Sequence, residues 1–377
     1  MNSKKVLILG TGFAGQGHTE AFRAASAEVV GIVGRTESVV TEVAKKLNIP
    51  YCGTDWEKAL RECKPDIVSI ATPGGAHYDA IMQALDYGCH VFCDKPLCET
   101  GQKAQNLYEK SLKSGVKTAF AASFRYMPEV LHAKRLVEQG VIGEPCEVEC
   151  ISHFNLNRDI PFGWSHRIEQ GGGRLNNNFT HLLSIVTQVI GENILSINGE
   201  TRSDMEKAPK VQGVHNFMTR RNYIPKDLND PSLEWGENNA EWSYTVLAKI
   251  KSDYPAKQPV SVLFKHGGLV PRVSDDHLVF YGTKGAIFIK GHYGKGPLYL
   301  WKDNKWEEQI LPSDIEQSLP KIEDDTQRNW TKLATEFVKD IMGEKVAPYQ
   351  TFKDGALYQK IIDIIRKNDR DINVSNL

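Results

Sequence analysis

The chain has 377 residues, a length that suggests two domains or one domain with a large extension. Hydrophobic residues make up 41% of the chain, enough for ordinary cores, and the formal net charge is −1. Because the charge is nearly balanced, we expect neither a nucleic-acid partner nor binding to an anionic membrane surface. No apolar run approaches the roughly 20 residues of a membrane span.

The seven cysteines all lie in the first 150 residues, and none forms a C-x-x-C pair: Cys52, Cys63, Cys89, Cys93, Cys98, Cys146 and Cys150. The segment around Cys89, Cys93 and Cys98 could suggest a metal site, but it is strongly apolar. We therefore expect buried free thiols, a cytoplasmic protein and no bound metal.

The first predicted elements are a strand, a glycine-rich loop and a helix. The strand lies within KVLILGTGFAG, residues 5–15, a helix pattern covers about 16–25, and a second strand covers 28–35. The short apolar run could pass for a signal peptide, but glycines interrupt it at once.

The glycine loop has the spacing of a dinucleotide-binding motif. Its glycines and the residues between them are Gly10, Gly12, Phe13, Ala14 and Gly15. In such a loop one glycine makes the turn, one admits the pyrophosphate, and one lets the helix pack on the strand. A plain glycine-rich turn is the alternative, and the strand before and helix after argue against it.

The end of the second strand bears on the choice of dinucleotide. An acidic residue there would bind the ribose 2′-hydroxyl of NAD, but the sequence reads Gly34-Arg35-Thr36. Arg35 could stack on adenine or pair with a 2′-phosphate, or it could be an ordinary exposed arginine. We expect NADP or NAD as cofactor, with NADP slightly favoured.

Beyond residue 36 helices and strands alternate. Helices are predicted around 40–47 and over 55–63, 77–88 and 101–115, and strands over 66–73, 90–96 and 116–124. This alternation predicts a mainly parallel, doubly wound α/β sheet. Ligands bind at the carboxyl ends of such strands, where Thr72, Pro73 and Lys95 lie beside the glycine loop.

Several segments, in this order and spacing, resemble the glucose–fructose oxidoreductase / inositol dehydrogenase / MocA family. They are SIATPGGAH at 69–77, DKP at 94–96, FRYMP at 124–128, EQGGGRLNNNFTH at 169–181, and the stretch 336–365. The resemblance implies a Rossmann domain (1–123) and an α+β domain (124–377) with a large, mostly antiparallel sheet. It also implies a C-terminal helix packed back on the first domain, and hydride exchange between NAD(P) and a sugar or cyclitol.

The composition of the second half agrees with this fold. Strand-like segments separated by turn residues occur at 144–155, 244–252, 259–267, 276–291 and 296–311. Residues 201–240 are polar and contain few strand signals, so we expect a long loop or insertion there that could lie over the site.

The run GGGRLNNNFTH at 171–181 precedes an apolar helix predicted over 174–188. The spacing places one apolar and one polar stripe on this helix, the polar one comprising Asn177, His181, Ser184 and Gln188. The glycines allow close backbone approach, and free N–H groups at a helix start favour an oxygen-rich ligand.

The resemblance implies that Lys95 and His181 are the catalytic pair, with Lys95 also next to the cofactor. A neutral imidazole can take the proton of a hydroxyl that loses hydride, and an ammonium can polarise the same oxygen. The family usually has aspartate where this chain has Asn177, which cannot take a proton at neutral pH. Asn177 could orient His181 or a substrate hydroxyl. The alternative is that the asparagines cap a helix and His181 is a core residue.

Other candidate ligand residues have structural alternatives. Arg125 and Tyr126 could line the substrate cleft or only join the domains. Trp164 and Arg167 could contact a sugar ring or pack in the core. His77 could reach the cofactor ribose or simply begin its helix.

The leading hypothesis is an NAD(P)-dependent oxidoreductase that acts on CH–OH groups of a sugar, a sugar derivative or an inositol. The alternatives are a glycoside hydrolase that works by transient oxidation on a retained NAD, and a non-catalytic regulator that senses a dinucleotide. Because the exposed face of the second sheet needs a cover, we expect a homodimer or homotetramer.

Overall fold

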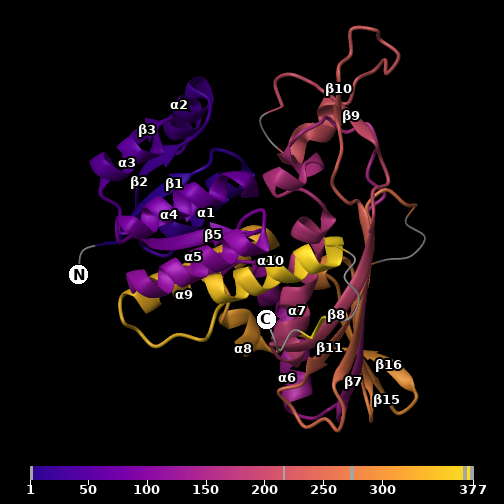
Figure 1. Cartoon of the computed structure of the whole chain (residues 1–377). Coiled ribbons are helices and arrows are strands. Elements are labelled where there is room, and N and C mark those ends of the chain that lie inside the picture. Colours follow the sequence, from indigo (N-terminus) through magenta and orange to yellow (C-terminus); the bar gives the residue numbers. More distant parts are fainter. Residues whose placement is uncertain (1–2, 215–216, 272–275, 368–371, 374–377) are drawn as a thin grey trace.

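The computed structural model describes residues 3–214, 217–271, 276–367 and 372–373. Two sheets dominate the fold and lie beside each other (Figure 1). The first is a six-stranded parallel sheet flanked by helices, and the second is large and mostly antiparallel. The predicted fold class, α/β followed by α+β, is therefore confirmed.

The first sheet has the strand order β3-β2-β1-β4-β5-β6. Its strands are β1 (Lys5–Leu9), β2 (Glu28–Val33), β3 (Tyr51–Gly53), β4 (Ile67–Ile70), β5 (His90–Asp94) and β6 (Thr118–Ala121). The helices between them are α1 (Phe13–Ala24), α2 (Glu37–Lys46), α3 (Trp56–Cys63), α4 (His77–Asp86) and α5 (Gly101–Ser114). The winding direction reverses between β1 and β4, and ligands of such sheets bind at this switch point.

Two helices from the end of the chain return to the first sheet (Figure 1). Helix α9 (Asp325–Ile341) packs against α1, and α10 (Phe352–Lys367) packs against α5. The contact of α9 is close: a Cβ at Gly17 would lie 2.3 Å from the ring of Trp330. Distant parts of the sequence thus complete the layers around this sheet.

The second sheet has the order β16-β15-β14-β13-β7-β12-β11-β8-β17 in the described part of the chain. Its neighbours are antiparallel except β7 and β12. The strands are β7 (Pro145–His153), β8 (Asn193–Arg202), β11 (Ser243–Lys251), β12 (Val260–Gly267), β13 (His277–Gly282), β14 (Ala286–Lys290), β15 (Leu298–Lys302), β16 (Lys305–Glu308) and β17 (Ile372–Asn373). Three helices accompany it: α6 (Pro128–Glu138), α7 (Thr180–Ile190) and the short α8 (Ser313–Gln317).

The polar segment expected to be an insertion is mostly irregular. It contains a small hairpin of β9 (Lys207–Pro209) and β10 (Trp235–Glu237) and a 3-10 helix over Phe217–Tyr223. Figure 1 shows it projecting at one end of the large sheet. None of the described helices is both long and apolar enough to cross a membrane.

All seven cysteine thiols are free. Four of them are buried as expected, but Cys52 and Cys146 are exposed and Cys63 is only partly covered. The expectation of burial is wrong for the exposed pair because Cys52 lies on the edge strand β3 and Cys146 at the start of β7.

Candidate functional site

The glycine loop between β1 and α1 is shaped by two close contacts and one open position. A Cβ at Gly10, where φ is +121°, would lie 2.4 Å from the carbonyl oxygen of Ala71, and one at Gly15 would lie 1.9 Å from that of Gly10. A Cβ at Gly12 would meet nothing within 4 Å. The loop therefore packs tightly at its two ends and leaves space at Gly12, as a bound pyrophosphate would require.

The surroundings of this loop also fit a dinucleotide. No side chain caps the first turn of α1, which leaves N–H groups there for an anion. Phe13 is 40% exposed, Ala14 is half-buried, and Arg35 is exposed at the end of β2. After β4, Pro73 is exposed, and the buried hydroxyl of Thr72 has no hydrogen-bond partner among the described residues.

His77 lies between the two loops that follow β4 and β5. Its Nε2 is 2.6 Å from the carbonyl oxygen of Thr72, and its Nδ1 is 3.0 Å from that of Pro96. Burial lowers the pKa of His77, and the contact with Thr72 partly opposes this. The ring is fully buried, so the structure does not place it at a ribose; it ties the loop of Thr72 to the loop of Lys95.

Lys95 reaches the second half of the chain. Its Nζ donates a hydrogen bond to Oδ1 of Asn177 over 3.1 Å, and its peptide bond to Pro96 is cis. Burial lowers the pKa of Lys95; the charge of Asp94 opposes this shift, and that of Arg174 adds to it. Lys95 and Asn177, both among the predicted site residues, are thus brought together from the two halves of the chain.

The helix predicted over 174–188 begins differently from a regular α-helix. Residues Leu175–Phe179 form a π-helical turn, and α7 follows from Thr180. The N–H groups of the preceding glycines are not free for a ligand: they donate to the carbonyl oxygens of Ile168, Arg167 and Ser165. The glycines instead permit close packing, since a Cβ at Gly171 would lie 2.8 Å from the Cα of Gly74.

His181 is 7% exposed, and its Nδ1 has no hydrogen-bond partner among the described residues. Burial lowers its pKa well below the usual value, and the nearby charge of Lys95 lowers it further. Its ring packs edge-on against Phe124 and Tyr293, with centroid separations of 4.6 and 5.1 Å. The imidazole is therefore neutral at physiological pH, the form that can accept a proton.

Tyr293 was not identified from the sequence, yet it supports this turn. Its φ of +53° is unusual for a residue with a side chain, and its ring stacks on Phe124 at 4.6 Å. Its hydroxyl accepts a hydrogen bond from Nδ2 of Asn178 over 3.0 Å and donates to the carbonyl oxygen of Asn177 over 3.5 Å. No pattern near residue 293 signals this role.

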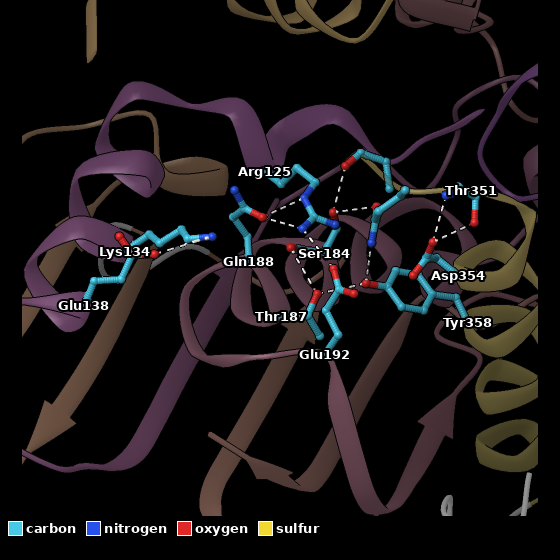
Figure 2. Close-up of polar contacts among 12 residues, drawn as sticks. Arg125, Lys134, Glu138, Ser184, Thr187, Gln188, Glu192, Thr351, Asp354 and Tyr358 are labelled. Carbon is cyan, nitrogen blue, oxygen red and sulfur yellow. Dashed lines mark hydrogen bonds and ion pairs between the residues drawn. The ribbon is translucent and has the colours of Figure 1, made fainter. Parts of the chain in front are cut away.

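Arg125 and Tyr126 do not join the group of Lys95, Asn177 and His181. Arg125 is 5% exposed and donates through Nε to Gln188 over 3.0 Å and through Nη2 to Glu192 over 3.1 Å (Figure 2). Tyr126 is buried in the core cluster that also contains Trp330 and Phe337, and burial raises its pKa to about 12. Both side chains join elements of the fold rather than line the candidate site.

The polar stripe on α7 is explained by the same contacts. Ser184 donates to the carbonyl oxygen of Ala122 over 2.8 Å, and Gln188 accepts from Arg125 (Figure 2). The stripe thus faces the segment 122–126, and of its members only Asn177 is bonded to Lys95.

Trp164 and Arg167 lie in the segment before the glycines. The ring of Trp164 is 5.1 Å from that of Phe217, and the guanidinium of Arg167 lies over Phe162 at 5.8 Å. Both are half-buried.

No group of three or more His, Cys, Asp or Glu within the described residues is arranged to hold a metal ion.

Comparison with known proteins agrees with the two-part fold. Residues 4–121 match the oxidoreductase family with an NAD-binding Rossmann fold, and residues 130–288 match the GFO/IDH/MocA C-terminal domain. The chain belongs to the GFO/IDH/MocA family of oxidoreductases. This confirms the relationship that the sequence motifs indicate.

Levoglucosan dehydrogenase of Pseudarthrobacter phenanthrenivorans is 26% identical over 204 residues, 51% of this chain and 52% of that protein. The scyllo-inositol 2-dehydrogenase (NAD(+)) of Bacillus subtilis is 27% identical over 197 residues, 52% of this chain and 56% of that protein. The matched stretch thus spans about half the length of these relatives. A solved complex of levoglucosan dehydrogenase with NADH and levoglucosan has a TM-score of 0.80 at 18% identity, over 99% of this chain and 100% of that one.

Proposed function

We propose that the protein is an NAD(P)-dependent oxidoreductase that transfers hydride between nicotinamide and a hydroxyl or carbonyl group of a sugar, a sugar derivative or an inositol. The contact of Lys95 with Asn177 carries the proposal, because it joins the ligand-binding end of the first sheet to the turn before His181. Relatives named levoglucosan dehydrogenase and scyllo-inositol 2-dehydrogenase support this substrate class.

In the proposed reaction, bound nicotinamide supplies the hydride acceptor. The imidazole of His181 takes the hydroxyl proton, since its lowered pKa keeps it neutral. Lys95 gives one N–H to Asn177 and has two further donors with which to polarise the substrate oxygen. Asn177 holds the ammonium in place, and because its amide cannot take a proton, the role of base falls on His181.

We propose NADP rather than NAD as the preferred dinucleotide. The support is local: Arg35 is exposed at the end of β2, where no carboxylate is present to bind a ribose 2′-hydroxyl. Titration with NADPH and NADH by fluorescence tests this. Arg35→Ala should weaken NADPH binding about tenfold and leave NADH binding nearly unchanged; equal loss for both would contradict the preference.

We also propose that residues 1–123 form the dinucleotide-binding unit and 124–377 the substrate-binding and oligomerisation unit of a homodimer or homotetramer. Two large apolar side chains exposed on the large sheet could contribute to this contact: Leu247 is 53% and Trp306 45% exposed. Free thiols at every cysteine support a reducing, cytoplasmic setting. Light scattering at micromolar concentration tests the assembly, and a monomer would contradict it.

The decisive test of the function is Lys95→Ala, with Lys110→Ala, a half-buried lysine of α5 that pairs with Asp86, as its control. A panel of sugars and cyclitols is screened with both dinucleotides through the absorbance of reduced nicotinamide. We expect Lys95→Ala to lower kcat by about 1,000-fold while dinucleotide binding persists, because a donor to the reacting oxygen is lost. Lys110→Ala should retain full activity.

Other outcomes separate the alternatives. Full turnover by Lys95→Ala would contradict the assignment. A dinucleotide that co-purifies and shows no net redox change during product release would favour the glycoside hydrolase. Dinucleotide binding without any turnover, together with activity gained in Asn177→Asp, would favour the non-catalytic regulator.

A further inference from the structure

Arg174 is a buried cation with an unused end. Its side chain is 7% exposed, its Nε donates to Nε2 of His266 over 2.9 Å, and its guanidinium lies 4.5 Å from the centre of the Phe154 ring. Its Nη2 is buried and has no hydrogen-bond partner within the described ranges of the chain. A buried arginine is normally paired with an acid, so an Nη2 group without an acceptor is unusual.

Glu241, an acid whose charge acts on Arg174, already accepts hydrogen bonds from other groups. Glu241 accepts two hydrogen bonds from Arg366, over 3.0 and 2.9 Å, and a third from the backbone N–H of Leu175 over 2.9 Å. Arg174 meets Glu241 only through the backbone, where its N–H donates to the Glu241 carbonyl oxygen. The guanidinium of Arg174 therefore has no hydrogen-bonded carboxylate among the described residues.

The unused end belongs to the neighbourhood of the candidate site. Arg174 directly precedes the π-helical turn that carries Asn177, and its charge contributes to the lowered pKa values of both Lys95 and His181. Its partner His266 belongs to β12, and Phe154 directly follows β7. Arg174 thus stands on the second sheet, away from the glycine loop between β1 and α1, and is not placed to bind a pyrophosphate there.

A third cation approaches from the polar insertion. Arg220 donates to the hydroxyl of Ser165, and its guanidinium lies over the ring of Phe217 at 4.1 Å. Burial, with a further contribution from the charge of Arg174, lowers its pKa to about 9. Lys95, Arg174 and Arg220 therefore create a region of positive charge that an incoming anion would stabilise.

We propose that the substrate carries a carboxylate and that Arg174 binds it, with Arg220 adding a second positive charge. This deepens the proposed function and rests on it: the substrate is a sugar acid or a carboxylated cyclitol. The guanidinium has an unused edge, and two parallel N–H donors match the two oxygens of a carboxylate. The hydroxyl of a neutral sugar would leave the charge of Arg174 unbalanced.

The test compares matched ligands on wild type, Arg174→Met, Arg174→Lys and Arg220→Gln. The probes are glucose and glucuronate, galactose and galacturonate, and glucose 6-phosphate. Each is assayed by kcat/KM and, without turnover, by calorimetry on the protein with its reduced dinucleotide. Arg328→Gln, on α9, whose guanidinium contacts Asp325 and Met127, serves as the arginine control.

We expect each acid to be preferred over its neutral partner at least about tenfold, and this preference to fall about 100-fold in Arg174→Met. Arg174→Lys should keep part of it, Arg220→Gln should weaken it, and Arg328→Gln should leave it unchanged. If Arg174→Met does not fold, the Arg174→Lys and Arg220→Gln results decide the matter.

Two results would overturn the proposal: a preference for neutral sugars that the Arg174 variants leave unaltered, or a preference for the phosphate over both acids. Turnover of neutral sugars alone would keep the oxidoreductase function and reject the carboxylate. Arg174-dependent binding of the acids without any redox turnover would keep the carboxylate site and reject the oxidoreductase function.

Discussion

The ammonium group of Lys95 and the side-chain amide of Asn177, 82 residues apart in the sequence, are joined by a 3.1 Å hydrogen bond. The partner of the lysine is therefore neutral, whereas the family usually supplies an aspartate. A carboxylate would stabilise the charged forms of Lys95 and His181, and an amide does so much less. Burial lowers the pKa values of both groups; the charge of Asp94 only partly opposes the shift at Lys95, and the nearby charge of Lys95 lowers the pKa of His181 further.

Asn177→Asp should raise the pKa values of Lys95 and His181. In the wild type, oxidation should stay nearly constant as the pH falls through about 6.5, because His181 remains neutral there. In the variant the acid limb of the kcat/KM profile should move up by about one pH unit. Asn177→Ala, which removes the bond without adding charge, is the control and should show no upward shift. An unmoved or lowered limb in Asn177→Asp would contradict this electrostatic account.

Two alanine substitutions in the glycine loop should have opposite effects. Gly15→Ala places a Cβ 1.9 Å from the Gly10 carbonyl oxygen, so it should lower the free energy of unfolding by about 2 kcal/mol or more. Gly12→Ala meets open space and should change stability by less than about 0.5 kcal/mol, yet weaken NADPH binding at least about tenfold. Urea unfolding and fluorescence titration measure the two effects. Unchanged NADPH affinity in Gly12→Ala would contradict the placement of the pyrophosphate at Gly12.

The steric cost of a side chain at Gly171, which lies against Gly74, can be measured separately from the cost of its positive φ. Gly171 has φ of +75° and Gly88 has φ of +71°, but a Cβ at Gly88 would meet nothing within 4 Å. Both alanine variants carry the cost of positive φ, about 1 kcal/mol. Gly171→Ala should cost about 1–3 kcal/mol more and lower kcat, because its Cβ would also press on Pro96, next to Lys95. Equal unfolding free energies and activities for the two variants would contradict this prediction, because they would mean that the Gly171 loop can move away from Gly74 at no cost.

His18 should make the fold sensitive to acid. It is fully buried, its Nδ1 is 2.9 Å from the hydroxyl of Ser69, and burial lowers its pKa to about 4. Because the unfolded histidine binds its proton near pH 6.5, stability is present above that pH and is lost as the pH falls toward about 4. Between about pH 7.5 and pH 5 this single group should remove about 2 kcal/mol from the free energy of unfolding.

His18→Asn, which can keep a bond to Ser69, should lose that part of the pH dependence. The measurement is urea unfolding of both proteins at the two pH values. His90→Asn is a suitable comparison, since His90 is only half-buried, whereas His18 is fully buried. If His18→Asn and wild type lose equal stability on acidification, His18 is not the group responsible.

The sequence predicted the first sheet well because each buried strand is followed by an amphipathic helix. It missed β3 and β8: β3 has three residues and is partly exposed, and β8 alternates weakly between buried and exposed positions. It also predicted a regular helix over 174–188, whereas the chain forms a π-helical turn first. The carboxylate of Glu241, from a distant segment, accepts a hydrogen bond from the N–H of Leu175 at the start of this turn, and periodicity cannot reveal such a contact.

The candidate site shows the same division. Lys95 and Asn177 were identified from the family resemblance together with their places, one directly after a parallel strand and the other after glycines at a helix start, and the structure joins them. Arg125 was grouped with them, but a motif does not reveal the direction of a side chain, and this one points to Gln188. Arg174 was passed over although it stands inside the most informative run of the sequence. Its importance depends on the lack of a hydrogen-bonded acid, and the sequence does not show which acids are bonded to other groups.

The contacts of Arg366 link the candidate site to the order in which the chain is made. This residue, on α10, donates to the carbonyl oxygen of Gly172 over 2.9 Å and pairs with Glu241. While a ribosome is still producing α10, the segment before Asn177 lacks these two contacts, and the first sheet lacks one of the helices that cover it. The release of residues 352–367 therefore completes both sides of the candidate site at the same stage of synthesis.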